Sequence, residues 1–304
     1  LNITAPKNNI RRSLNKVSIA FKSPTVQYLS FGLAMIILIV SALYIPNMSS
    51  LKDEIANFLV YSISTIGFCL LLGYSGLASL GTAGFFGVGG FLTYYGLSQW
   101  KVTMVPTLLI VGIVSIILGL AVGFISLRIE GIYLAILTLC FSEVIVKILR
   151  AIKSSGVKVD SYAGDLNLFG LVLNKMAIYI IIALVLTLLL IITTNLIRSP
   201  TGRAMQAMKS STSAAQAMGI SLMKYRLLAF VISSLFASVA GYFYIMCCDV
   251  LDMNNADVLN LTFSLNILGA VIIGGAKSLW GAIFGTFFVL NLQHIVLSRI
   301  PFFR

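Results

Sequence analysis

Apolar residues in this chain gather in long runs, and polar or basic residues separate these runs. A helix needs about 20 apolar residues to cross a bilayer, and the pattern predicts about nine membrane segments, within a range of 8–10, in the 304 residues. We expect the segments at 28–45, 55–72, 78–98, 105–125, 131–149, 176–197, 227–246, 259–275 and 281–298. Pro24, Pro46, Pro200 and Pro301 fall between them. The pattern predicts an all-α, polytopic helical membrane protein.

Composition excludes a soluble enzyme. The chain is 59% hydrophobic and only 10% charged, whereas soluble domains average roughly 45–50% apolar and roughly 25% charged residues. The net charge is +12, but the basic residues lie in the gaps between apolar runs, where membrane topology places them. We therefore expect contact with lipid and no binding of nucleic acid.

The distribution of lysine and arginine predicts the orientation, because these residues favour cytoplasmic loops. The stretches 1–24 and 198–226 each carry five basic residues and no acidic one. The loop 247–258 carries three aspartates and is expected outside. We predict a cytoplasmic N-terminal tail at 1–24 and a single transmembrane domain at 25–304 with a cytoplasmic loop at 198–226. Nine spans leave the basic end of the chain outside, so either 78–98 or 259–275 re-enters the membrane, or the chain continues past Arg304.

The stretch 73–90 contains seven glycines in eighteen residues, which allows two interpretations. Small residues three or four positions apart let helices approach closely, and Gly81 and Gly84 provide such a face. Alternatively, the helix is broken beside a solute path, where irregular backbone is tolerated. In that case Ser79, Gly81, Thr82 and Gly84 are candidates for lining the path.

The loop 198–226 is too long for a turn and too polar for a span. Its small apolar residues recur at helical spacing and are Ala204, Ala207, Met208, Ala214, Ala215 and Met218. We predict two short helices that share one flat apolar surface, suited to a socket on a partner protein. An amphipathic loop on the membrane surface is the alternative. The candidate docking residues are Gly202, Arg203, Ala214, Ala215 and Gly219.

Glu143 is a further candidate for the path, because an ionisable residue inside a span often has a function. Lys147 follows four residues later, so a self-neutralising pair is the alternative. A stand-alone secondary transporter would need several such charges, and the chain lacks them. No phosphate-binding loop occurs, since Gly275 stands where that motif needs lysine after Gly274. The spacing of cysteine and histidine fits no metal site, and we expect no catalytic, cofactor or metal site.

Five passages together resemble the M-type permease subunit of the branched-chain amino acid class of ATP-binding-cassette (ABC) importers. They keep the family's order and cover about residues 55–290. They are the glycine-rich run 73–90, the passage Arg128–Tyr133 leading to Glu143, the loop 202–220, the passage Lys224–Phe230 with Gly241, and the passage 274–281.

The resemblance implies a machine of several subunits in the bacterial cytoplasmic membrane. A second permease subunit would share the path, two cytoplasmic ATP-binding subunits would hydrolyse ATP with magnesium, and an external binding protein would deliver the solute. ATP-driven movement would pass through a coupling helix at about 203–219. This chain would itself be no enzyme.

The chain departs from the family pattern at three places, two of which, the glutamine positions and the outer loop, are plausible positions on the substrate path. Ala78 and Thr82 stand where glutamine is common, Thr212 and Ser213 occupy a region that is usually acidic, and the loop 150–175 lacks adjacent glycines. Branched-chain amino acids are the first expectation. Related permeases carry urea, amides, sugars or nucleosides, which remain alternatives.

Overall fold

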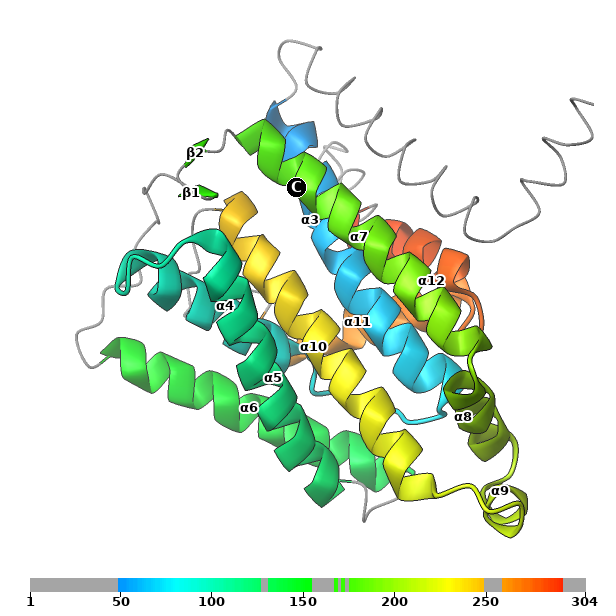
Figure 1. Ribbon diagram of the computed structural model, residues 1–304. Coiled ribbons are helices and arrows are strands. Elements are labelled where there is room, and N and C mark those ends of the chain that lie inside the picture. Colours follow the sequence, from blue (N-terminus) through cyan, green and yellow to red (C-terminus); the bar gives the residue numbers. More distant parts are fainter. Residues whose placement is uncertain are drawn as a thin grey trace, which may run out of the picture.

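The computed structural model describes residues 49–126, 131–154, 167–168, 171–172, 175–248 and 259–291. These residues form a bundle of helices whose axes run mostly along one direction (Figure 1). The predicted tail 1–24 and the first predicted segment, 28–45, lie outside the described residues. So does most of the predicted outer loop 247–258.

The first half of the bundle contains α3 (Ser49–Phe68), the π-helix η1 (Cys69–Tyr74), α4 (Thr82–Ser98), α5 (Met104–Ser126) and α6 (Ile132–Ser154). A two-residue antiparallel pair, β1 (Asn167–Leu168) and β2 (Leu171–Val172), precedes α7 (Lys175–Arg198). Two short helices follow, α8 (Pro200–Ser210) and α9 (Thr212–Ala217). The last elements are α10 (Leu222–Cys248), α11 (Leu261–Gly274), α12 (Leu279–Thr286) and the π-helix η3 (Phe287–Asn291).

Four stretches are long and apolar enough to cross a membrane: Glu54–Tyr74, Met104–Ile125, Ala177–Arg198 and Leu222–Cys247. Each coincides with a predicted segment. The remaining described segments are shorter or more polar: α4 has 17 residues and α11 has 14, while the 23-residue α6 carries several charges. The all-α, polytopic membrane class is confirmed. The total of nine segments stays a prediction, since part of the chain lies outside the described residues.

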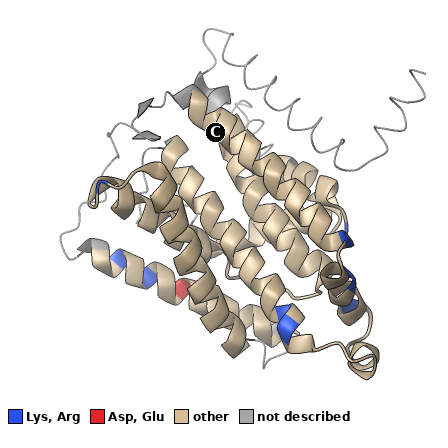
Figure 2. Ribbon diagram, in the orientation of Figure 1, with Lys and Arg blue, Asp and Glu red and all other residues tan. Residues whose placement is uncertain are grey.

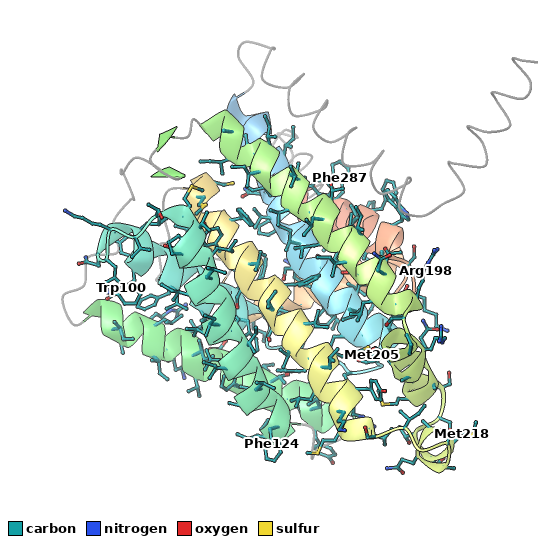
Figure 3. All side chains as sticks on the ribbon, in the orientation of Figure 1. Trp100, Phe124, Arg198, Met205, Met218 and Phe287 are labelled. Atoms are coloured by element: carbon teal, nitrogen blue, oxygen red, sulfur yellow. The ribbon has the colours of Figure 1, made fainter. Side chains whose placement is uncertain are left out.

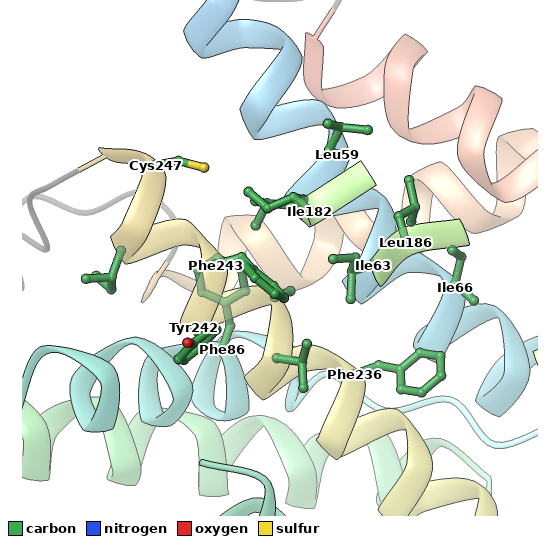
Figure 4. Close-up of a cluster of buried hydrophobic side chains, with 14 of the residues drawn as sticks. Leu59, Ile63, Ile66, Phe86, Ile182, Leu186, Phe236, Tyr242, Phe243 and Cys247 are labelled. Atoms are coloured by element: carbon green, nitrogen blue, oxygen red, sulfur yellow. The ribbon is translucent and has the colours of Figure 1, made fainter. Parts of the chain in front are cut away.

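Helix α10 is the central element, and it packs against α3, α4 and α5. Its aromatic residues enter a large buried cluster with side chains of α3 and α7. Figure 4 shows Ile63, Ile182 and Phe243 in this cluster. In contrast, α5 and α6 present exposed apolar side chains, among them Ile113, Ile117, Tyr133 and Ile136. Such a surface suits a membrane protein, because lipid replaces water as its solvent.

Glycines allow α4 and α10 to cross with their backbones in contact. A Cβ atom on Gly89 would overlap the carbonyl oxygen of Ser238, and one on Gly241 would overlap that of Phe86. The Ser238 hydroxyl donates a hydrogen bond of 2.9 Å to the Phe85 carbonyl. Gly81 and Gly84 serve the same purpose on another face, because Gly84 lies directly against Ser142 of α6. The close packing that the glycine pattern predicts is therefore present.

The helices α11 and α12 form a tight hairpin. Gly274 and Gly281 lie so close that a Cβ on either would overlap the carbonyl oxygen of the other. Gly275 ends α11 with a φ of 92°, which a glycine adopts without strain. Ser278 begins α12, since its hydroxyl accepts a hydrogen bond of 3.1 Å from the Gly281 amide. At about 1.5 Å per residue, the 14 residues of α11 extend only about 21 Å.

We expect Gly89→Ala to destabilise the protein more than Gly112→Ala. The added methyl at Gly89 must displace the α10 backbone, which costs about 1–3 kcal/mol when a packed core is overfilled. Gly112 is the matched control, because it is also inside a helix but a Cβ there meets no atom within 4 Å. Thermal unfolding in detergent measures the difference. Equal unfolding temperatures for the two variants would contradict the backbone contact.

Candidate functional site

The glycine-rich run 73–90 does not form one continuous helix. Helix α3 passes into η1, which ends at Tyr74, and α4 does not begin until Thr82. Gly76 lies between them with a φ of 75°, a conformation that favours glycine. The Leu77 amide donates to the Leu71 carbonyl at 3.1 Å, so the chain reverses immediately after η1. Of the two interpretations of the glycine-rich run, the structure contains both the close packing and the break.

The start of α4 is buried, and side chains from other helices satisfy its first backbone donors. The Ala83 amide donates to the Ser264 hydroxyl at 3.0 Å, and the Leu80 amide donates to the Thr138 hydroxyl at 3.0 Å. Thr82 also donates to Ser264, at 2.9 Å. A helix start inside an apolar bundle needs such partners, because water is not there to replace them.

A small cavity lies at this break, between the start of α4 and α10. Its volume is about 10 Å³, close to the minimum for one water molecule. It is lined by Leu71, Ser79, Gly81, Thr82, Phe85, Phe230, Ser233, Ser234 and Ala237. The cavity therefore combines four hydroxyl groups with two aromatic rings.

The four hydroxyls differ in their partners. Ser234 donates to the Val231 carbonyl at 2.9 Å, and Ser79 accepts from the Gly81 amide at 3.3 Å. The Ser233 hydroxyl makes no hydrogen bond within the described part of the chain, although the residue is only 4% exposed. Because Ser233 also lines the cavity, its hydroxyl is available to a guest there. Ser233 is not among the residues predicted from the sequence, although two adjacent serines inside an apolar span are a signal that could have identified it.

The structure brings together three of the five candidate path residues. Ser79, Gly81 and Thr82 line the cavity. Gly84 lies one turn further along α4 and packs against α6. Glu143 is half-buried on α6 and is not among the residues that line the cavity. Although Lys147 lies one turn away (Figure 2), no salt bridge forms between these two described residues.

The loop 198–226 contains the two short helices that its sequence predicts. Ser199 begins α8 by accepting a hydrogen bond of 3.3 Å from the Gly202 amide. Ser211 begins α9 in the same way, because its hydroxyl accepts a hydrogen bond of 3.3 Å from the Ala214 amide. Gly219 ends α9 with a φ of 79°, which explains why a glycine stands there.

The single apolar surface predicted for these helices is wrong. Met205, Met208 and Ala215 are buried in a cluster with Leu71 and Phe230 of the bundle. Ala207, Ala214 and Met218 are exposed, with Met218 exposed to 83%. Figure 3 shows Met218 at the outer end of the loop and Met205 nearer the bundle. Because alanine and methionine occur on both sides of these helices, spacing alone could not divide them into two faces.

The division separates the five candidate docking residues. Arg203, Ala214 and Gly219 are exposed, and the Arg203 guanidinium donates to the Arg198 carbonyl at 3.2 Å. Ala215 is only 3% exposed and contacts the bundle. Gly202 is buried, and a Cβ there would overlap the Ile197 carbonyl oxygen, so the position has no room for a side chain. Since the buried residues cannot contact a partner, the accessible surface consists of the exposed Arg203, Ala207, Ala214 and Met218. We call this surface the outer face of α8–α9.

We expect Ser264→Ala to destabilise the start of α4. The substitution leaves the Ala83 amide without its partner in an apolar environment, which costs about 1–3 kcal/mol. Thr262→Val is the control, because Thr262 is exposed on the same helix. Thermal unfolding in detergent compares the two. If both variants unfold at the wild-type temperature, Ser264 does not cap α4.

The features described so far define a class of protein. An apolar helical bundle with four membrane-spanning stretches and a hydroxyl-lined cavity at a buried helix start is consistent with a membrane permease. The chain belongs to the family of permease components of branched-chain amino acid transport systems, which it matches over residues 51–302. It is therefore a permease subunit of an ABC importer and an integral protein of the bacterial inner membrane.

Curated relatives agree with this assignment. The chain is 28% identical over 296 residues to the high-affinity branched-chain amino acid transport system permease protein LivM of Salmonella typhimurium, covering 87% of this chain and 67% of the relative. The LivM protein of Escherichia coli gives the same identity and coverage. The autoinducer 2 import system permease protein LsrC of an Enterobacter species is 30% identical over 120 residues, which is 38% of this chain and 35% of that protein. No solved structure matches.

Proposed function

We propose that this chain is one of two permease subunits of an importer for branched-chain amino acids. A second, homologous permease completes the path, and an extracytoplasmic binding protein delivers the solute. Two ATP-binding subunits hydrolyse ATP with magnesium. The family match over residues 51–302 is the observation that carries the proposal, and the names of the two LivM relatives support the substrate.

The outer face of α8–α9 is the proposed docking site for an ATP-binding subunit. Arg203, Ala207, Ala214 and Met218 are all exposed, so this face is accessible to a partner protein. The inner face of the same helices is packed on the bundle. A rigid element held on one side by the permease and on the other by an ATPase can carry movement between them.

The proposed orientation places α8 and α9 in the cytoplasm. Basic residues gather at this end of the bundle (Figure 2), as cytoplasmic loops require, and the loop 198–226 carries Arg198, Arg203, Lys209, Lys224 and Arg226. The predicted tail 1–24 carries five more basic residues and would lie on the same side.

We expect Met218→Asp to abolish co-purification of the ATP-binding subunit. The substitution places a charge on the outer face, where burial without a counter-charge would be costly. Gln99→Asp is the control, because it adds the same charge at an exposed position at the other end of the bundle. The measurement is a pull-down with the complete set of transporter subunits, followed by ATP turnover. Retention of the ATPase by Met218→Asp would exclude this face as the docking site.

Ala215 is a poor choice for the same experiment. Its side chain contacts the bundle, so a charge there would disturb the permease itself before any partner binds.

The cavity at the start of α4 is the proposed part of the path in this subunit. The N-terminal end of a helix carries partial positive charge, and broken transporter helices direct such ends at anionic groups of the solute. A cavity of about 10 Å³ is too small for an amino acid, so the arrangement described here is a closed one. Opening would have to separate the start of α4 from α10.

We expect Ser233→Leu to reduce leucine uptake by at least about tenfold, equivalent to about 1.4 kcal/mol, because the larger apolar side chain fills the cavity. Leu228→Phe is the control, since it enlarges an exposed residue on the same helix. Uptake of radiolabelled leucine into proteoliposomes is the measurement, with complex assembly checked in parallel. Undiminished uptake by Ser233→Leu would place the path elsewhere. Uptake of urea, an amide, a sugar or a nucleoside, but not of leucine, by the wild-type importer would overturn the proposed substrate.

A further inference from the structure

Lys209 joins the coupling loop to the break in the glycine-rich segment. Lys209 is near the end of α8, and its ammonium group donates to the Gly73 carbonyl at 2.6 Å and to the Leu72 carbonyl at 3.3 Å. Both carbonyls belong to η1, the last helical turn before the break. A cation at the carbonyl end of a helix is favourable, and its hydrogen bonds are stronger than those between neutral groups.

The backbone of α8 also lies against the break. A Cβ on Gly76 would come within 3.0 Å of the Lys209 side chain. Because Gly76 already has a positive φ, this position combines a special backbone conformation with a close neighbour. Lys209 therefore contacts both sides of the reversal after η1.

The turn between α11 and α12 supports the break from another side. A Cβ on Gly73 would overlap the carbonyl oxygen of Ala276. The Tyr74 hydroxyl donates to the Lys277 carbonyl at 2.8 Å. The end of η1 is therefore held between α8 and the 275–278 turn, and it has little room to move independently of either.

A short path of covalent and hydrogen bonds leads from Lys209 to the cavity. Leu72 accepts a hydrogen bond from Lys209, and the preceding residue, Leu71, lines the cavity. The Leu71 carbonyl accepts from the Leu77 amide, two residues before Ser79. A displacement of α8 would therefore reach the cavity wall through the backbone of residues 71–79.

We propose that Lys209 is a positioning residue that transmits movement of α8 to the segment between η1 and α4 and so couples ATP hydrolysis to opening of the cavity. This inference rests on the proposed docking of an ATP-binding subunit at α8–α9. Lys224 offers a contrast, because it is exposed at the same end and makes no hydrogen bond to any described residue. A contribution of Lys224 through general positive charge would not depend on contact with η1.

The test uses the complete importer in proteoliposomes. Radiolabelled leucine is supplied on the side from which the importer takes up substrate, and ATP is supplied on the side of the ATP-binding subunits. Three variants are compared with the wild type: Lys209→Met, Lys209→Arg and Lys224→Met. Leucine transported per ATP hydrolysed is measured, together with the ATPase rate, subunit assembly and thermal unfolding.

We expect Lys209→Met to lower the leucine-to-ATP ratio by at least about tenfold, the size of a lost hydrogen bond to a charged group. Assembly and ATPase rate should stay within about twofold of the wild type. Lys209→Arg should restore most of the ratio, because it keeps the charge and the donors. Lys224→Met should leave the ratio unchanged.

An unchanged ratio in Lys209→Met overturns the proposal. So does a fall in which assembly, unfolding temperature and ATPase rate decline together, because the contact would then only stabilise the fold. Failure of arginine to restore the ratio would show that the positive charge is not the cause. If the wild-type chain binds no ATP-binding subunit, the proposed function fails instead, and this result is separate from any effect of Lys209.

Discussion

The need to satisfy backbone polar groups away from water governs this structure. A helix that breaks inside an apolar bundle exposes amides and carbonyls that lipid cannot bind. Here Ser264 of α11 and Thr138 of α6 accept from amides at the start of α4, while the exposed Lys209 donates to carbonyls at the end of η1. The buried start of α4 therefore depends on the assembly of α6 and α11 around it.

Close contact between backbones is the second condition, and glycine provides it. Gly89 and Gly241 bring α4 against α10, while Gly73 brings the end of η1 against the 275–278 turn. Small residues matter more here than in a soluble protein, because lipid gives no hydrophobic drive for one apolar helix to leave it for another. Association depends instead on the fit of the surfaces. The glycine-rich segment thus combines the break with the packing that holds the break in place.

The fold class was predictable from the sequence, whereas the division of the docking loop was not. Runs of apolar residues give the position of a span directly, since a bilayer sets the required length; α5, α7 and α10 lie where the pattern places them. The serines and the glycine at the ends of α8 and α9 also have local reasons to stand there, because their side chains or backbone angles satisfy helix ends. By contrast, Ala214 and Ala215 are neighbours with equal hydrophobicity, yet only Ala215 faces the bundle. That difference depends on how the loop is rotated against α10. The cavity escaped prediction for the same reason, since Ser79 and Ser233 are far apart in sequence and meet only after folding.

The tight hairpin of α11 and α12 has a consequence for how the chain is made. A span requires at least about 17 apolar residues to enter the bilayer on its own, and α11 has 14. During synthesis this helix therefore lacks the length to leave the translocation machinery alone. Its contact with α12 through Gly274 and Gly281 lets the two helices partition into lipid as a pair. We therefore expect α11 to enter the bilayer only together with α12, so the two glycines that join the hairpin also link the insertion of its helices.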